Sequence, residues 1–76
     1  MEEQLKEIMG DILNLDAGSV DGSTSKDNTA SWDSLNHINL VVALEQEFGL
    51  LFDLQEIESM LSYDQILQVL ERKLQG

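Results

Sequence analysis

Apolar residues recur at helical spacing along four stretches of the chain. In the first stretch, residues 2–15, they repeat at steps of three and four positions. These residues are Leu5, Ile8, Met9, Ile12 and Leu13. Such spacing places all of them on one face of a helix. The pattern predicts a helix over residues 2–15 with that face buried.

A second helix is predicted over residues 34–48, which hold good helix formers and precede Gly49, a typical left-handed cap. Asp33 is expected to cap its amino end. Steps of about 100° per residue put one apolar group in the core-facing sector. That group is Ile38, Leu40, Val41, Leu44 and Phe48. Leu35 and Val42 fall outside it, which suggests a docking strip, although scattered apolar residues are also ordinary on protein surfaces.

Two further helices follow. Asp53 with Glu56 has the form of a helix cap, and it predicts a short helix over residues 54–61. Ser62 with Gln65 forms a capping box before the fourth predicted helix, residues 63–75.

The segment 16–33, between the first two helices, is rich in Gly, Ser and Thr and is predicted to be a loop. Structureless connections longer than about 12 to 15 residues usually serve a function or are disordered. No proline or strand alternation interrupts the helical pattern. We therefore expect an all-α fold: a small antiparallel bundle of three longer helices and one short helix, forming a single domain over residues 1–76.

Length and charge narrow the possible functions. A chain of 76 residues has no room for a large active site beside its core. Its 15 acidic and 4 basic residues give a net charge of -11, which repels nucleic acid and anionic membranes and favours basic partner proteins. Without cysteine there is no thiol nucleophile. The acidic amino terminus and the lack of an apolar run of about 20 residues indicate no signal peptide and no membrane span, so we expect a cytoplasmic monomer.

The common catalytic and metal-binding motifs do not fit the sequence. An EF-hand loop starting at Asp21 would have Lys26 in place of Gly and Trp32 in place of the final Glu. No Gly-x4-Gly-Lys phosphate loop is present. His37, the only histidine, is interpreted as a packing or surface residue, because its pairing with Ser34 lacks oxyanion donors. We expect no bound metal and no catalytic activity.

Ser34 stands at the predicted start of the second helix. Its hydroxyl would lie beside unpaired backbone amides and the positive end of the helix dipole, which favours a phosphate attached at this point. The same serine could simply begin the helix, because Ser and Asp are common capping residues. The residues alone leave both interpretations open.

At these residues the sequence resembles the acyl carrier protein family. The similarity runs through residues 32–35 (Trp-Asp-Ser-Leu), the helix 36–48 and Gly49, and the order of helices covers essentially the whole chain. It implies that Ser34 is the attachment point for 4'-phosphopantetheine, joined by a phosphopantetheinyl transferase that uses coenzyme A and magnesium. Asp33 would assist this attachment. The thiol of the arm would carry acyl groups as thioesters, so a protein without cysteine could take part in thiol chemistry.

The resemblance also implies a surface that partner enzymes recognise. These partners would be the transferase, an acyl-loading ligase or acyltransferase, and downstream enzymes of a fatty-acid, polyketide or other specialised acyl pathway. The docking residues would be Leu35, Asn36, Asn39, Val42, Glu45, Gln46 and Leu54.

This sequence departs from the family pattern at the docking surface. Family members that make fatty acids commonly have acidic residues at the positions of Asn36, Asn39 and Leu54. Trp32 and His37 beside the serine look more like those of stand-alone carriers in specialised pathways. We therefore expect the partners to recognise the apolar docking residues more than charged ones. Those residues are Leu35, Val42 and Leu54.

Apolar residues of the second and third helices would line the bundle interior, where carriers of this family can shelter an acyl chain. The candidates are Val41, Leu44, Ile57 and Met60. Ordinary core packing explains the same residues.

Two alternative functions stay open. Carriers of aminoacyl or D-alanyl groups share this architecture, and the sequence around Ser34 does not separate them from acyl carriers. The other alternative is a helical interaction module that is never modified, although the intact Asp33-Ser34-Leu35 run argues against it.

Overall fold

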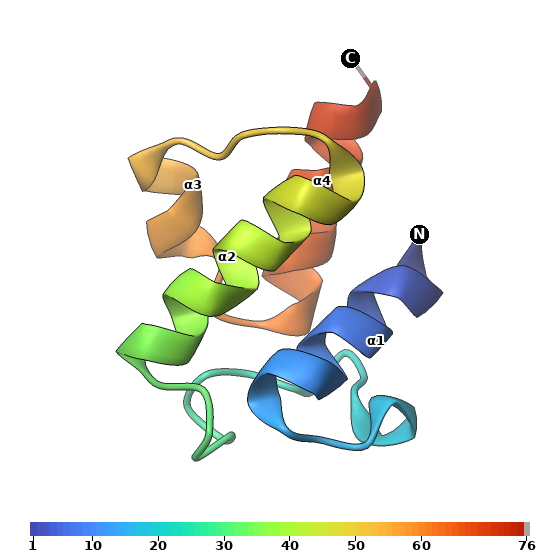
Figure 1. The fold of residues 1–76 in the computed structure, drawn as a ribbon, viewed down its shortest axis with the longest axis vertical. Helices are drawn as coiled ribbons and strands as arrows, with labels where there is room; N and C mark the ends of the chain where they lie inside the picture. The colour runs from blue at the N-terminus through green and yellow to red at the C-terminus, as the bar shows by residue number, and fades with distance from the viewer. Residues whose placement is uncertain (76) are drawn as a thin grey trace.

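Four α-helices and one short 3-10 turn make up the fold of residues 1–75, the part of the chain that the computed structural model describes. The helices are α1 (Glu2–Leu13), α2 (Ser34–Phe48), α3 (Leu54–Ser59) and α4 (Tyr63–Gln75), and the turn is η1 (Ala17–Ser19). Consecutive helices run in opposite directions, with α1 and α3 descending and α2 and α4 ascending in Figure 1. The expected all-α antiparallel bundle is confirmed, and α3 is its short helix.

The core lies between one face of each long helix. Its most buried members are Leu5, Met9 and Leu13 from α1, Leu40 and Leu44 from α2, and Ile66 and Leu70 from α4. Val20 and Trp32 from the connection between α1 and α2 join this cluster. Burial of such side chains is the main favourable term in folding, and in a chain without cysteine it acts without the help of disulfides.

The long connection between α1 and α2 is fixed by backbone hydrogen bonds to Leu61, in the turn after α3, and to Tyr63, the first residue of α4. The Lys26 amide donates to the Leu61 carbonyl at 2.8 Å, and the Tyr63 amide donates to the Thr24 carbonyl at 2.9 Å. Thr24 is buried as well. These bonds hold the segment that leads into α2.

α1 ends earlier than predicted, at Leu13 rather than at residue 15. Asn14 adopts the left-handed conformation with φ 56°, which stops the helix. The Leu15 amide then folds back to the Gly10 carbonyl at 2.8 Å. Asparagine tolerates this conformation better than other non-glycine residues, but the apolar spacing alone extends the helix past it.

α3 also ends earlier than predicted, at Ser59 rather than at residue 61. Met60 leaves the helical conformation, with φ -85° and ψ 66°, and its side chain is buried. The turn brings the Leu61 carbonyl to the Lys26 amide. Pairing with the long connection therefore sets the end of α3.

Ile38 contradicts the prediction that it faces the core, because 53% of it is exposed. The buried residues of α2 are His37, Leu40, Val41 and Leu44. Ile38 lies about 100° from His37 around the helix axis, beyond the edge of that face. Leu35 and Val42 are exposed, as their positions outside the core sector predict.

Within residues 1–75, no helix has both the length and the apolar character needed to cross a membrane. The same part of the chain holds no group of three or more His, Asp or Glu side chains placed to bind a metal ion.

Candidate functional site

Ser34 is the first residue of α2 and is exposed. Asp33 precedes it as the amino-terminal cap: its Oδ1 accepts from the Asn36 amide at 2.8 Å, and its carbonyl accepts from the His37 amide at 2.8 Å. The predicted cap is therefore confirmed. Because Asp33 is occupied with later amides of the helix, the Ser34 side chain is not needed to close the first turn.

The amides of Ser34 and Leu35 make no hydrogen bond to other residues of the part described. A helix start leaves such amides free, and together with the helix dipole they favour an anion. An exposed hydroxyl beside these donors suits a phosphodiester attached to Ser34 Oγ. The donor set at this point of the fold therefore fits a phosphorylated prosthetic group.

Side chains on both sides of Ser34 fix the segment that carries it. The Trp32 indole Nε1 donates to His37 Nδ1 at 3.0 Å, and both side chains are buried. Asn36 Nδ2 donates to the Ser31 carbonyl at 2.8 Å. His37 is therefore a buried packing residue with a specific partner, and its spacing of five positions from Trp32 gives no sequence signal that the two side chains meet.

One face of α2 presents apolar side chains to solvent. Leu35, Ile38 and Val42 are exposed by 70%, 53% and 45%. Leu51 and Leu54, after α2, are exposed by 77% and 70%. Ile38 and Leu51 join these exposed apolar residues, although neither was predicted to be a docking residue. Ile38 was predicted to face the core, and Leu51 lies outside any helix.

The predicted docking residues near the end of α2 meet at a hollow of about 340 Å³. It is lined by Val42, Glu45, Gln46, Gly49, Leu50 and Leu51. Glu45 also has a structural contact there, because its Oε2 accepts from the Phe52 amide at 3.0 Å. Toward the start of α2, Asn39 Nδ2 donates to Asn36 Oδ1 at 3.3 Å. Asn36 is thus held by its neighbours, whereas Asn39 and Gln46 are exposed.

Comparison with known proteins gives the family. Residues 3–72 match the family described as "Phosphopantetheine attachment site". The chain belongs to the acyl carrier protein family. An acyl carrier protein of Petrotoga mobilis is 32% identical over 72 residues, which cover 95% of this chain and 85% of that protein. The acyl carrier protein of Thermosynechococcus vestitus is 31% identical over 72 residues, covering 95% and 89%.

A third relative is the "Polyketide-8 synthase acyl carrier protein 2" of Streptomyces avermitilis, 32% identical over 73 residues that cover 96% of this chain and 84% of that protein. As a member of this family, the chain is a carrier of acyl groups and not an enzyme. Its cofactor is 4'-phosphopantetheine, whose thiol supplies the thioester chemistry. Its partners include a phosphopantetheinyl transferase and pathway enzymes.

The acyl-pocket candidates of this carrier lie in its packed core. Val41, Leu44 and Met60 are buried, and Ile57 is half-buried against them. None of the four lines the hollow at the end of α2 or the groove between α3 and α4.

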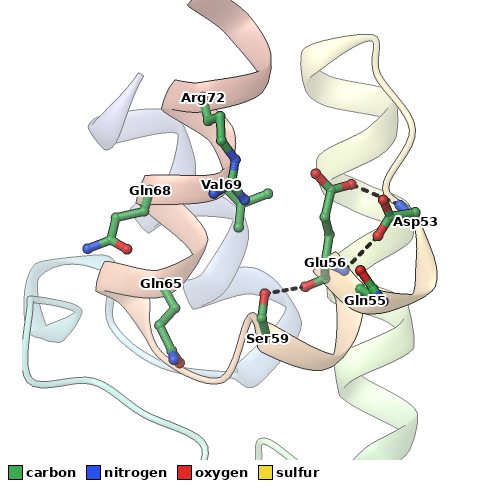
Figure 2. Close-up of a pocket in the computed structure, with 8 residues that line it drawn as sticks. All are labelled: Asp53, Gln55, Glu56, Ser59, Gln65, Gln68, Val69 and Arg72. Carbon is green, nitrogen blue, oxygen red and sulfur yellow. Dashed lines mark hydrogen bonds between the residues drawn. The ribbon is translucent and has the colours of Figure 1, made fainter.

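The groove between α3 and α4 has a volume of about 540 Å³ and a mainly polar lining (Figure 2). It is lined by Gln65, Gln68, Val69 and Arg72 of α4 and by Gln55, Glu56 and Ser59 of α3, with Asp53 just before α3. The Asp53 amide donates to the Glu56 carboxylate, and Lys73 donates to it at 2.9 Å. In that order these contacts lower the pKa of Glu56 below its ordinary value. This polar groove is unsuited to an acyl chain.

Proposed function

We propose that Ser34 carries the 4'-phosphopantetheine arm of this acyl carrier. The observation that supports the proposal is the position of the Ser34 hydroxyl, exposed at the first residue of α2 beside free backbone amides. Asp33 keeps the helix start intact, so the hydroxyl is available to a transferase. Because Asp33 is exposed, its second carboxylate oxygen is also available to help position magnesium during attachment.

The test is to incubate the chain with a broad-specificity phosphopantetheinyl transferase, coenzyme A and magnesium, and to measure the intact mass. The wild type should gain the mass of one phosphopantetheinyl group, and Ser34→Ala should gain none. Ser59→Ala is a matched control that removes another exposed serine, and it should be modified like the wild type. An unchanged wild-type mass, or a gain that survives in Ser34→Ala, would refute the assignment.

Partner enzymes are proposed to bind the outward face of α2 chiefly through apolar contact. Val42 and Leu51 meet at the hollow, and Leu35 and Ile38 extend the apolar face toward Ser34. Leu54 adds an exposed apolar side chain at the start of α3. Between Asp33, the cap, and Glu45, α2 has no acidic residue. A basic partner surface would therefore gain little electrostatic attraction along this part of the helix.

The pathway is proposed to be a specialised one rather than general fatty-acid synthesis, since Asn36 and Asn39 put no charge on the part of the docking face nearest Ser34. The similarity to a polyketide synthase carrier protein agrees with this proposal but does not select an acyl group. The experiment is to offer the phosphopantetheine-bearing chain fatty-acyl, malonyl, aminoacyl and D-alanyl groups, each with its corresponding ligase or transferase. The group that is loaded efficiently distinguishes an acyl carrier from an aminoacyl or D-alanyl carrier. Efficient loading with an amino acid alone would overturn the acyl assignment for this chain.

A further inference from the structure

A continuous line of hydrogen bonds joins three elements of the fold beside Ser34. Trp32, in the segment before α2, donates from Nε1 to His37 Nδ1 at 3.0 Å. His37 Nε2 lies 2.8 Å from the Ile57 carbonyl of α3. An indole N–H can only donate, so Nδ1 of His37 accepts and Nε2 carries the proton that is donated to Ile57. The neutral Nε2–H tautomer of His37 is the form that satisfies both bonds.

α3 has few other anchors. It is six residues long, and none of its side chains is fully buried. Lys73 of α4 holds it through Glu56 at 2.9 Å. On the α2 side, the described residues give α3 one side-chain hydrogen bond, from His37. A helix this short gains little stability by itself, so such contacts decide whether it stays in place.

We propose that Trp32, His37 and the Ile57 carbonyl form a latch that couples the segment carrying Ser34 to α3. Displacement of Trp32 leaves Nδ1 of His37 without its donor and frees the imidazole to turn, which breaks the bond to Ile57. α3 then opens away from α2 more often, next to the buried Met60 and Val41. The latch consists of two side chains and one backbone carbonyl of this chain. It rests on the proposed function only in taking Ser34 as the residue that is modified.

Burial of the hydrogen-bonding groups makes the coupling between the Ser34 segment and α3 stronger than apolar packing alone would make it. Trp32 is 2% exposed and His37 is 8% exposed, so water does not readily replace a lost partner. Removal of the indole N–H therefore leaves Nδ1 of His37 with an unmet hydrogen bond in a buried site, so a change at Trp32 is transmitted to His37. The ring centroids of Trp32 and His37 are 6.2 Å apart and the ring planes are inclined by 27°.

The first measurement needs no substitution. The chain has one tryptophan and one histidine, so its nitrogen-15 spectrum gives a single indole signal and a single imidazole. Near pH 8 the latch requires the proton on Nε2 and an unprotonated Nδ1. A proton found on Nδ1 would overturn the proposal.

The second measurement follows amide hydrogen exchange of α3 in variants. Trp32→Phe keeps an aromatic ring but removes the indole N–H, and it should speed exchange of the α3 amides by about threefold to tenfold, the effect of one hydrogen bond. His37→Gln places an amide donor near the position of Nε2 and has no acceptor at Nδ1. In that background, Trp32→Phe should add nothing to the exchange rate of α3.

Lys73→Met is the matched control, because it loosens α3 from the α4 side without touching the latch. In the Lys73→Met background, Trp32→Phe should retain its full effect on α3. Unchanged α3 exchange in Trp32→Phe, or an equal effect in the His37→Gln background, would overturn the latch. Ser34→Ala should leave all of these rates as they are, so failure of the Ser34 assignment and failure of the latch give different results.

Discussion

The side chain of Tyr63 shows how burial and one neighbour change the chemistry of a single residue. Tyr63 is 3% exposed, and its hydroxyl donates to Glu2 at 2.9 Å, so the first residue of α4 is hydrogen-bonded to the first residue of α1. Burial, and after it the hydrogen bond and charge of Glu2, raise the pKa of Tyr63 from 10.0 to about 12. The folded chain therefore holds this proton more tightly than the unfolded chain does.

This difference predicts a loss of stability at high pH. Between pH 10 and about 12, the folded state keeps the tyrosine proton and the unfolded state releases it, so the free energy of unfolding falls as pH rises. Urea unfolding at several pH values from 8 to 12 should show a steeper fall for the wild type than for Tyr63→Phe. Glu2→Gln should keep part of the slope, because burial, the largest single cause of the raised pKa of Tyr63, remains. Equal slopes for the wild type and Tyr63→Phe would contradict the prediction.

The helix caps of the site could be predicted from residue type, whereas the buried Trp32–His37 pair could not. Asp33 and Gly49 are caps because of their own chemistry, and both are found where the sequence places them, Gly49 with φ 65°. The Trp32–His37 pair could not be predicted in the same way. Its bonds depend on how the long connection and α3 pack onto α2, and the Ile57 carbonyl lies twenty positions from His37.

On the scale of elements, helical periodicity predicts the fold well because each long helix buries one stripe. The order of elements and their main apolar faces follow from it. The ends of α1 and α3 do not. Asn14 stops α1 by taking the left-handed conformation, and α3 stops at Met60, just before Leu61 pairs with the long connection. Periodicity carries no information on either feature. The prediction that Ile38 faces the core is wrong for a related reason. The projection of a single helix gives the direction of its buried face but not the width of that face.

The exposed face of α2 leads to a prediction about partner recognition. Val42→Ala should lower kcat/KM for phosphopantetheine transfer by about tenfold, because it removes apolar contact at the hollow. Asn39→Glu should change it by no more than about twofold, since recognition there relies little on charge. Initial rates with the transferase give both values.

Leu61→Ala is a matched control for Val42→Ala. Leu61 is 42% exposed and Val42 is 45% exposed, but Leu61 lies outside α2 and does not line the hollow. Transfer to Leu61→Ala should stay near the wild-type rate. The apolar docking proposal is wrong if Val42→Ala is as active as Leu61→Ala, or if Asn39→Glu raises activity strongly.

The charge of the whole molecule is uneven. Net charge is -11, and three exposed acidic residues, Glu3, Glu7 and Asp11, stand four positions apart along α1. Like charges at this spacing repel each other on a helix. By contrast, α4 has Arg72 and Lys73 in its last turn, and Glu71 next to them has no acidic residue three or four positions away. The same change of charge should therefore have different effects on the two helices.

Glu7→Gln should raise the free energy of unfolding by about 0.5 kcal/mol at low salt, because it removes two repulsive pairs along α1. Glu71→Gln changes net charge equally and should give a smaller gain or none. Urea unfolding at about 10 mM and 500 mM sodium chloride checks this, because salt shortens the range of the repulsion to about 4 Å and should erase the advantage of Glu7→Gln. Equal gains in both variants would mean that the total charge, rather than the α1 stripe, limits stability. A gain in Glu7→Gln that persists at high salt would mean that its cause is helix propensity and not repulsion.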